Sequence, residues 1–429
     1  MRQTHFALTL LTATILAGCG SSSTGDQTLK TKFSAQVSFG DSLSDVGTYA
    51  VGTVLALKGG KYNINGDNTA INPALTGKNW TELMATQLGL PAPCAAQTGL
   101  NGVAGFAVPV VNHAGCFGYA QGGARVTQAA GPGNATLAAS LGGSAVLGQL
   151  TVPVATQVQN HLAQPASGGK FKGDEIVFVM AGANDVLVQL AILNVNATAA
   201  GTAAATAAVT AAVPGRVTSD IAAGLCTPTD AQASNCVTQA IAELTPTVGA
   251  SAGAAAGAAY VANTGGPAAV QAMGQAGVEL VALVKTQIVG KGANFVTVNN
   301  VPDVATTPSA LAQSASIQGL IGAMVKAFND QLASGFAGES RVLLVDVFAV
   351  SHDQVVNPGP YGLTNVTATA CDLTPAKNAL GSSLVCNASN LVAGDVSHYA
   401  FADSVHPTPF NYLLLARYVA EKLVVRGWL

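Results

Sequence analysis

Four short apolar runs, separated by much longer stretches that are compatible with helices, limit the fold of this chain more than any other feature. The runs are residues 35–39, 175–181, 294–298 and 341–347. Strands that are buried on both faces of a sheet are near-continuous apolar runs, and helical crossovers join parallel strands. We therefore predict an α/β fold with a parallel sheet, in one domain over residues 35–429.

The last segment of the chain predicts a helix that closes this domain. It follows Pro407 and Pro409, and proline is tolerated at the start of a helix but not in its interior. Apolar side chains then recur at helical spacing over residues 410–426. They include Leu413, Leu414, Tyr418, Val419 and Leu423.

The composition separates this chain from disordered and nucleic-acid-binding proteins. Hydrophobic residues make up 49% of its 429 residues and charged residues only 9%, which is enough apolar material for a large core. The formal net charge is −3, the sequence pI is near 6.0, and no run of Lys or Arg occurs. We therefore expect no nucleic-acid partner, and we expect a monomer.

Residues 191–277 depart from the compact pattern, because Ala, Thr, Gly and Val dominate them. They look like an insertion between the second and third predicted strands. Their position suggests a mobile apolar cap over a catalytic edge of the sheet. The alternative, which we favour, is a helical hairpin packed on the side of the sheet or a partly disordered excursion.

The first residues predict a targeting segment. Arg2 and His5 precede an apolar stretch, 6–17, that is too short to span a hydrocarbon core of roughly 30 Å but has the length of a signal-peptide core. We expect residues 1–18 to be a removable signal. Residues 20–32 are rich in Ser, Thr and Gly, so residues 19–34 are expected to form a flexible tether.

The end of this signal, Leu16-Ala17-Gly18-Cys19, is similar to the lipobox of bacterial lipoproteins. The resemblance implies that Cys19 receives lipid, becomes the mature N-terminus and attaches the protein to a membrane. Because Gly20 rather than an acidic residue follows, it also implies an outer-membrane lipoprotein of the cell envelope. The alternative is an ordinary secretory signal on a secreted or periplasmic protein.

Six cysteines remain after Cys19, an even number in a chain sent to an oxidising compartment. Six cysteines allow about 15 pairings. Proximity in the sequence favours three short loops, and no Cys-x-x-Cys or Cys/His cluster has zinc spacing, so we expect disulfides and no metal. The favoured pairs are Cys94 with Cys116, Cys226 with Cys236, and Cys371 with Cys386.

Short blocks that carry chemistry flank the predicted strands and the closing helix. A serine hydroxyl is a weak nucleophile at neutral pH, so it needs a base, and that base needs an orienting acid. Ser42, expected where a strand ends and a helix begins, is the candidate nucleophile; His406 is the candidate base and Asp403 the acid. The blocks are Gly40-Asp41-Ser42-Leu43, Gly122-Gly123-Ala124, Gly182-Ala183-Asn184-Asp185 and Asp403-Ser404-Val405-His406-Pro407.

These blocks, in this order, resemble those of the GDSL or SGNH hydrolase family. The segments Tyr119–Ala124, 301–303, 357–366 and 401–408 are similar to its lecithinase/haemolysin-like and plant-type branches, although Gly118 stands where many members carry Asn. The resemblance implies a three-layer, flavodoxin-like α/β/α sandwich that hydrolyses carboxylic esters with neither metal nor organic cofactor.

The same resemblance implies three oxyanion donors: the backbone N–H of Ser42, the backbone N–H of Gly123 and the side-chain amide of Asn184. Glycine at position 123 lets the backbone approach a substrate closely, and Gly122 is the alternative donor. We expect Asp41 and Asp185 to brace these loops through backbone N–H groups. Each oxyanion donor is worth roughly 2.7 to 4 kcal/mol in enzymes where one has been removed.

Other candidates in the sequence are weaker. Asp395 and His398 repeat the Asp-x-x-His spacing but lack the following proline and helix. Residues 249–253 match G-x-S-x-G, yet no strand precedes them. His113, His161 and His352 have no carboxylate at a persuasive spacing, so we expect them to be structural or surface residues.

The sequence therefore predicts an extracytoplasmic esterase or lipase that acts through an acyl-enzyme on a small-molecule or lipid ester. Fold and triad do not choose among substrates. Alternatives are a phospholipase or acyltransferase, or a polysaccharide O-deacetylase, which would prefer acetyl groups. A binding lipoprotein with an inactive triad is less favoured, because every residue of the constellation is present.

Overall fold

The structure is a computed structural model that describes residues 31–66, 75, 77–103, 105–141, 146–227 and 233–429. The expected signal 1–18, Cys19 and most of the expected tether lie outside the described residues.

A four-stranded parallel sheet forms the centre of the α/β body, as the four apolar runs predict. Its order is β1-β4-β5-β6, and Val177 of β4 pairs with Val37 on one side and Val296 on the other. The strands are β1 (Gln36–Gly40), β4 (Ile176–Met180), β5 (Phe295–Asn299) and β6 (Val342–Val345).

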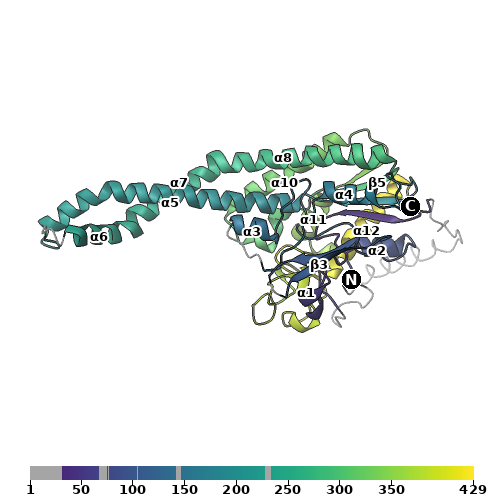
Figure 1. Ribbon diagram of the computed structural model, residues 1–429, viewed down its shortest axis with the longest axis horizontal. Helices are drawn as coiled ribbons and strands as arrows, with labels where there is room; N and C mark the ends of the chain where they lie inside the picture. The colour runs from purple at the N-terminus through teal and green to yellow at the C-terminus, as the bar shows by residue number, and fades with distance from the viewer. Residues whose placement is uncertain (1–30, 67–74, 76, 104, 142–145, 228–232) are drawn as a thin grey trace, which may run out of the picture.

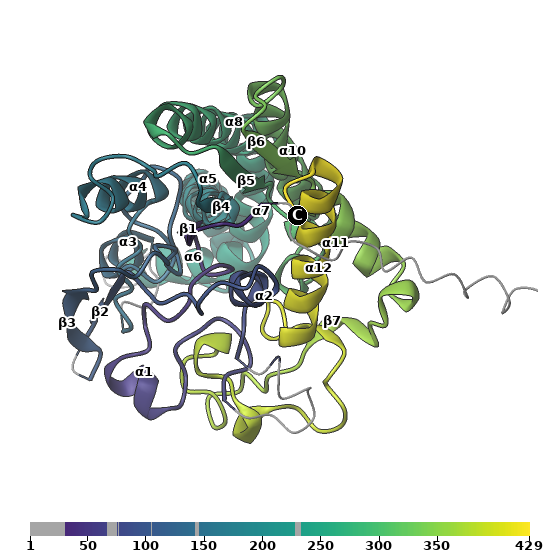
Figure 2. The same ribbon diagram turned by 90° about the vertical axis from the view of Figure 1, so that its right-hand side faces the viewer.

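Helices cover both faces of this sheet (Figure 2). Because side chains alternate along a strand, Val177 and Val179 of β4 enter one hydrophobic cluster, whereas Ile176 and Phe178 enter the other. The first cluster contains α4 (Val154–Ala163), α8 (Gly266–Leu283) and α10 (Ala315–Gly335). The second contains α2 (Trp80–Gln87), α11 (Val347–Val356) and α12 (Pro409–Arg426). The body is thus a three-layer α/β/α sandwich.

Helix α12 is the predicted closing helix. Thr408 caps its start by accepting a hydrogen bond from the Asn411 N–H at 3.2 Å, and proline occupies its first position. The buried side of the helix includes Tyr412, Val419 and Leu423.

The outer edge of β1 carries one further short piece of parallel pairing. Tyr119 N–H donates to Ser38 O at 2.8 Å, and Ser38 N–H donates to Phe117 O at 3.0 Å. The segment around Gly118 therefore extends the sheet beyond β1, so the chain leaves β1 for one neighbour and later returns as β4 on its other side. Sites in open α/β sheets lie at such switch points, at the carboxyl ends of the strands.

Smaller elements surround the sandwich. They comprise a β-hairpin, a two-stranded parallel ribbon, three short helices and five 3₁₀ turns: β2 (Gln97–Asn101), β3 (Ala107–Asn112), β7 (Asn365–Thr369), β8 (Tyr399–Phe401), α1 (Gly52–Ala56), α3 (Ala135–Leu141), α9 (Pro308–Leu311), η4 (Val289–Lys291), η5 (Val304–Thr306), η6 (Gly359–Tyr361), η7 (Ser383–Val385) and η8 (Ala388–Asn390).

A long helical arm projects from the body (Figure 1). Its outgoing helix is α5 (Ala183–Ala222), and its returning side comprises α6 (Ala233–Leu244), α7 (Ala250–Tyr260) and then α8. Three π-helical turns lie on the returning side: η1 (Thr245–Gly249), η2 (Val261–Gly265) and η3 (Val284–Ile288). The predicted hairpin is therefore present, but only its base packs on the body, whereas its outer part extends away from the sheet.

Small residues let the two sides of the arm approach closely. A methyl group added to Gly201 would lie 2.9 Å from the Gly253 carbonyl oxygen. Two described helical segments, Ala183–Ala222 and Asn235–Lys291, are long and apolar enough to span a membrane by length and composition alone. The base of α5 is nevertheless part of the body, where Val186, Val188 and Leu193 are buried.

Within the part of the chain that the structure describes, three disulfides each join cysteines that are neighbours in the sequence. They are Cys94–Cys116 beside the edge of the sheet, Cys226–Cys236 at the tip of the arm and Cys371–Cys386 behind the carboxyl edge of the sheet.

Candidate active site

Ser42 lies directly beyond the carboxyl end of β1. Gly40, the last residue of the strand, has a φ of +151°, and an added methyl group would lie 2.1 Å from the Met180 carbonyl oxygen. Only glycine permits this close passage between β1 and β4, which sets the direction in which the chain leaves the sheet.

The segment after Ser42 is a turn rather than the expected helix start, so that prediction was wrong. The reason is the carboxylate of Asp45. It accepts hydrogen bonds from the N–H groups of Gly47 at 2.9 Å and Thr48 at 2.8 Å, which forms a local turn in place of helical bonds. No helix dipole is therefore directed at Ser42 from this segment.

His406 bridges Ser42 and Asp403. Its Nε2 lies 2.9 Å from the Ser42 Oγ, and its Nδ1 lies 2.8 Å from the Asp403 Oδ2. A carboxylate only accepts hydrogen bonds, so Nδ1 carries the proton and Nε2 is free to accept the proton of Ser42. The three residues predicted from the two ends of the domain thus form one hydrogen-bonded chain.

The surroundings of Asp403 favour its charged form. Burial alone would raise its pKa, but the electrostatic interaction with His406 and the hydrogen bonds to the carboxylate together hold the pKa well below its ordinary value. The carboxylate accepts from Ser383 N–H at 2.7 Å, Val405 N–H at 3.0 Å and His406 N–H at 2.8 Å. Asp403 is therefore an ionised acceptor with a fixed orientation.

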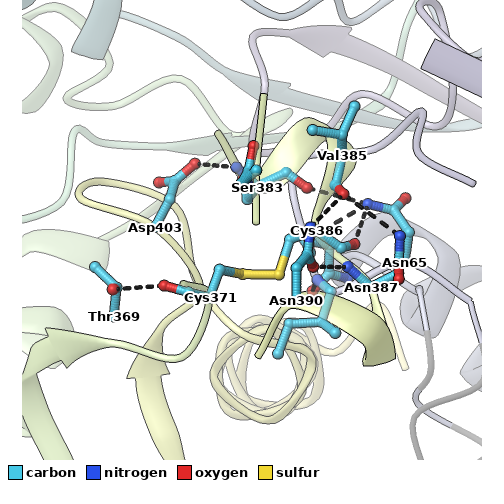
Figure 3. Close-up of a disulfide and its surroundings, with 12 residues drawn as sticks. Asn65, Thr369, Cys371, Ser383, Val385, Cys386, Asn387, Asn390 and Asp403 are labelled. Carbon is cyan, nitrogen blue, oxygen red and sulfur yellow. Dashed lines mark hydrogen bonds between the residues drawn. A yellow bond between two sulfur atoms is a disulfide. The ribbon is translucent and has the colours of Figure 1, made fainter. Parts of the chain in front are cut away.

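The disulfide Cys371–Cys386 lies behind this carboxylate (Figure 3). Ser383, which donates to Asp403, begins η7, and Cys386 follows that turn. The side-chain amide of Asn65 donates to the carbonyl oxygens of Ser383 and Cys386, each at 3.1 Å. The loop that holds the triad acid is thus secured by a covalent bond and by a residue from near the start of the domain.

Three potential oxyanion donors, from Ser42, Gly123 and Asn184, face one pocket. The pocket has a volume of about 260 Å³, and Ser42, Gly123, Asn184 and His406 line it. Gly123 has a φ of +80°, and an added methyl group would lie 2.3 Å from the Pro132 carbonyl oxygen. Within the described residues, the N–H groups of Ser42 and Gly123 have no hydrogen-bond acceptor. They are available to a ligand.

The neighbouring N–H of Gly122 is already occupied. It donates to the Asp45 Oδ2 at 2.9 Å, so Gly122 is a poorer oxyanion donor than Gly123. The Asn184 amide donates to Ala124 O at 2.9 Å through Nδ2, which leaves its second amide hydrogen for a ligand.

Asp41 and Asp185 brace the site loops, in line with the sequence analysis. The Asp41 carboxylate accepts from Leu43 N–H at 3.1 Å, and burial raises its pKa to about 7. Asp185 accepts from Val126 N–H at 3.1 Å and from the Arg125 guanidinium at 2.9 Å. Neither carboxylate is hydrogen-bonded to the triad.

Sequence reasoning missed Tyr62 and Gln149. The Tyr62 ring lies 4.7 Å from the His406 ring, and the Gln149 amide donates a hydrogen bond to its hydroxyl. Both residues line the pocket with Ser42, but neither belongs to a block of recognisable spacing. Asp45 had a signal, because Asp45-Val46-Gly47-Thr48 is typical of a turn in which an aspartate side chain caps the backbone.

The weaker candidates lie elsewhere. Asp395 accepts from Ser397 N–H at 2.9 Å, while His398 packs its ring edge-to-face against Phe410. The G-x-S-x-G match lies in the arm.

The three other histidines have separate environments. His352 pairs with Asp303 at 2.8 Å, although the imidazole is 53% exposed; this carboxylate is too distant in sequence for spacing to reveal. His113 contacts the Thr98 hydroxyl, and His161 is buried among aromatic rings. Over the residues that the structure describes, no three His, Cys, Asp or Glu side chains are grouped as metal ligands.

Comparison with known proteins gives partial matches. No family model matches the chain. Over 92 residues, 21% of this chain, it is 32% identical to the GDSL esterase/lipase At2g40250 of Arabidopsis thaliana, of which the match covers 24%. Over 90 residues, also 21% of this chain, it is 30% identical to the GDSL esterase/lipase At1g58430 of the same plant, of which the match covers 23%. The chain thus matches about a quarter of the length of these curated relatives. It is similar to GDSL esterase/lipases over about a fifth of its own length.

Proposed function

We propose that this protein hydrolyses carboxylic esters with Ser42 as nucleophile, His406 as general base and Asp403 as the acid that orients the base. The observation that carries the proposal is the hydrogen-bonded chain from Asp403 through His406 to the Ser42 Oγ, with His406 contacts of 2.8 and 2.9 Å. Ser42 and His406 are 364 residues apart in the sequence, so only the fold brings them together.

The reaction follows from this geometry. The Ser42 Oγ attacks the ester carbonyl carbon while its proton moves to the His406 Nε2. The resulting imidazolium is stabilised by the ionised Asp403. When the tetrahedral intermediate collapses, His406 gives the proton to the departing alcohol, and an acyl-enzyme remains on Ser42. Water, deprotonated by the same nitrogen, then releases the carboxylic acid.

The negative oxygen of the tetrahedral intermediate needs donors that are already in place. We assign this role to the N–H groups of Ser42 and Gly123 and to the Nδ2 of Asn184. The bond of Asn184 to Ala124 O and that of Gly122 to Asp45 hold the donors before a substrate arrives. Preorganisation of this kind stabilises the transition state without reorganisation during the reaction.

The proposed substrate is a small-molecule or lipid ester, met outside the cytoplasm. The three disulfides among the described residues fit an oxidising compartment. Attachment to the outer membrane through Cys19 is part of the proposal. Phospholipase, acyltransferase and polysaccharide O-deacetylase activities use the same triad, and they differ in acyl-chain preference and in the acceptor of the acyl group.

The test is hydrolysis of p-nitrophenyl esters from acetyl to palmitoyl. Ser42→Ala is expected to lower kcat by at least about 10³-fold, because the nucleophile is lost. The matched control is Ser251→Ala, which alters the unrelated G-x-S-x-G serine and should leave kcat within about twofold. A fluorophosphonate should label the wild type and not Ser42→Ala. If wild type hydrolyses no ester and Ser42 takes no label, the esterase proposal is wrong.

The lipid anchor has a separate test. Cells that express the protein are grown with a fatty-acid analogue that can be tagged, beside cells that express Cys19→Ser. Label on the wild type and none on Cys19→Ser is the expected result. An unlabelled wild type would contradict the anchor and favour the secreted or periplasmic alternative, without bearing on the esterase chemistry.

A further inference from the structure

A second cavity adjoins the pocket at Ser42. It has a volume of about 430 Å³. It shares Leu187, Val304, Thr307 and Val405 with the pocket that Ser42 and His406 line, so the same side chains form walls of both. The shared walls place the two cavities side by side, and we take them as one path that begins at Ser42 and passes Asn184.

The wall of the second cavity is uncharged. Leu190 and Leu193 come from α5, Val261 from η2, and Ile317 and Ile321 from α10. Among the described residues that line this cavity, none is Asp, Glu, Lys, Arg or His. Four uncharged polar side chains, Asn194, Thr307, Ser309 and Gln313, also line the cavity. An alkyl chain that packs against its leucine, isoleucine and valine walls would still gain free energy on leaving water, whereas a charged group would find no partner of opposite charge there.

The path continues to the surface of the body. Val261 and Ile317 also line an open groove of about 950 Å³ beside α8 and α10, with Val270 and Leu320 among its other walls. This groove is likewise without charged residues in its lining. A chain longer than the second cavity therefore has an exit along a mostly apolar groove.

We propose that this path is an acyl-chain groove, and that it makes the enzyme prefer esters of medium and long fatty acids over acetate. Asn184, an oxyanion donor, and Leu187, Leu190 and Leu193 follow one another along α5. A carbonyl oxygen at Asn184 thus directs its own alkyl chain along this helix. The base of the arm is the selective element of the site.

This inference rests on the proposed esterase function and adds a substrate class to it. Each methylene that leaves water should raise kcat/KM roughly fourfold, so three buried methylenes raise it roughly 60-fold. Wild type should therefore hydrolyse p-nitrophenyl decanoate at least about 50-fold better than p-nitrophenyl acetate. Acetate esters of butanol and octanol should show no comparable gain, because the groove takes the acyl chain.

The decisive variant is Ala191→Trp, because Ala191 lines the second cavity and is only half-buried. An indole there would fill the groove. The ratio of kcat/KM for decanoate to that for acetate should fall at least about tenfold. The matched control is Ala199→Trp, the same change at an exposed position of α5, which should keep the wild-type ratio. Ile317→Ser, a milder change at a half-buried wall, should lower the ratio less and covers the case in which Ala191→Trp does not fold.

Two results would contradict the proposal of an acyl-chain groove. One is an active enzyme whose ratio is the same in wild type, Ala191→Trp and Ile317→Ser. The other is a gain with the length of the alcohol instead of the acyl chain.

A binding experiment keeps the groove testable if no ester is hydrolysed. Dodecan-2-one carries a carbonyl group and an alkyl chain but no ester bond. It should bind the full-length Ser42→Ala protein in a calorimetric titration and bind at least about tenfold more weakly when Ala191→Trp is added. Binding without hydrolysis would support the groove and contradict the esterase, whereas hydrolysis of acetate without this binding would do the reverse.

Discussion

Strand β4 in the body buries all five of its residues, whereas α7 in the arm buries none of its eleven. The body is held by large side chains that fill two clusters on either side of a sheet. The arm is built from alanine-rich helices, whose residues have high helix propensity, with close backbone contact at Gly201 and Gly253. The difference shows that one chain can use burial for one part and local helix formation for another.

The candidate site lies where these two parts meet. Asn184 is in the first turn of α5, and the same helix continues outward as the arm. The body thus supplies the triad, and the base of the arm supplies one donor and a wall of the adjoining cavity.

Among changes that leave the nucleophile in place, Asp403→Asn should have the largest effect. An amide can donate to the imidazole, so it no longer enforces the tautomer in which Nε2 accepts the Ser42 proton, and kcat should fall by about 10⁴-fold. The measurement is kcat for a p-nitrophenyl ester. Asp395→Asn is the matched control, because it alters the exposed aspartate of the repeated Asp-x-x-His spacing, and it should leave kcat within about twofold. A loss of less than about tenfold in Asp403→Asn would contradict the assigned role.

The disulfides Cys371–Cys386 of the body and Cys226–Cys236 of the arm both close short loops, but their removal should affect stability and activity differently. Cys371→Ala with Cys386→Ala opens a loop of 15 residues behind Asp403, which should lower the free energy of unfolding of the body by about 3 kcal/mol and also reduce kcat. Cys226→Ala with Cys236→Ala should speed hydrogen exchange in α6 only. Denaturant unfolding and kcat of the two double variants separate the cases; equal losses in both would mean that body and arm unfold together.

Much of the body was predictable because its signals are local. An apolar run such as 175–181 predicts a buried strand by itself. Asp403 and His406 are three residues apart, so their pairing can also be predicted without knowledge of the rest of the chain. The turn after Ser42 was only partly predictable in this way, because Asp45-Val46-Gly47-Thr48 is a local turn signal but the second contact of Asp45 is not local. Its shape depends on Asp45, whose second oxygen is held by Gly122, and this partner is brought close only by the pairing of residues 117–119 with β1.

The direction of the arm was hidden for a different reason. Its sequence is so uniform in Ala, Thr and Gly that no stripe of large side chains marks a face that must be buried, so composition predicts helices but not what they pack against. Tyr62 was hidden because stacking on His406 joins residues far apart in the sequence.

The body contains buried titratable groups that make its stability depend on pH. Burial and the nearby charge of Lys172 lower the pKa of His161 from 6.5 to about 4. The folded state therefore favours the neutral imidazole. The contribution of His161 to the free energy of unfolding is therefore fully present above pH 6.5. It is lost as the pH falls from 6.5 towards 4, because the unfolded state then binds a proton that the folded state does not.

Between pH 7.5 and 4.5, wild type should lose about 2 to 3 kcal/mol more unfolding free energy than His161→Gln, which removes the titrating group. Denaturant melts at the two pH values measure this. His113→Gln, at the β2–β3 hairpin, is the matched control and should retain the wild-type difference. If His161→Gln loses as much unfolding free energy between the two pH values as wild type does, the pH dependence belongs to another group.

Removal of the outer arm should have the smallest effect, and it tests the comparison most directly. Ala205 and Gly249 face each other across the arm: a methyl group added to Gly249 would lie 3.8 Å from the Ala205 carbonyl oxygen. Residues 206–248 can therefore be replaced by Gly-Ser-Gly. Because α6 contacts α5 and η1 rather than the sheet, the unfolding free energy of the body should change by less than about 1 kcal/mol.

The same deletion distinguishes an acyl-chain groove at the base of the arm from a cap formed by the outer arm. The groove walls from Leu187 to Ala197 and at Val261 remain, so the ratio of decanoate to acetate hydrolysis should stay within about twofold of wild type. A cap formed by the outer arm would instead be lost, and chain-length preference would disappear with it. If the deletion abolishes the preference while the body remains folded, selectivity belongs to the outer arm, and the boundary between body and arm does not coincide with the boundary of the site.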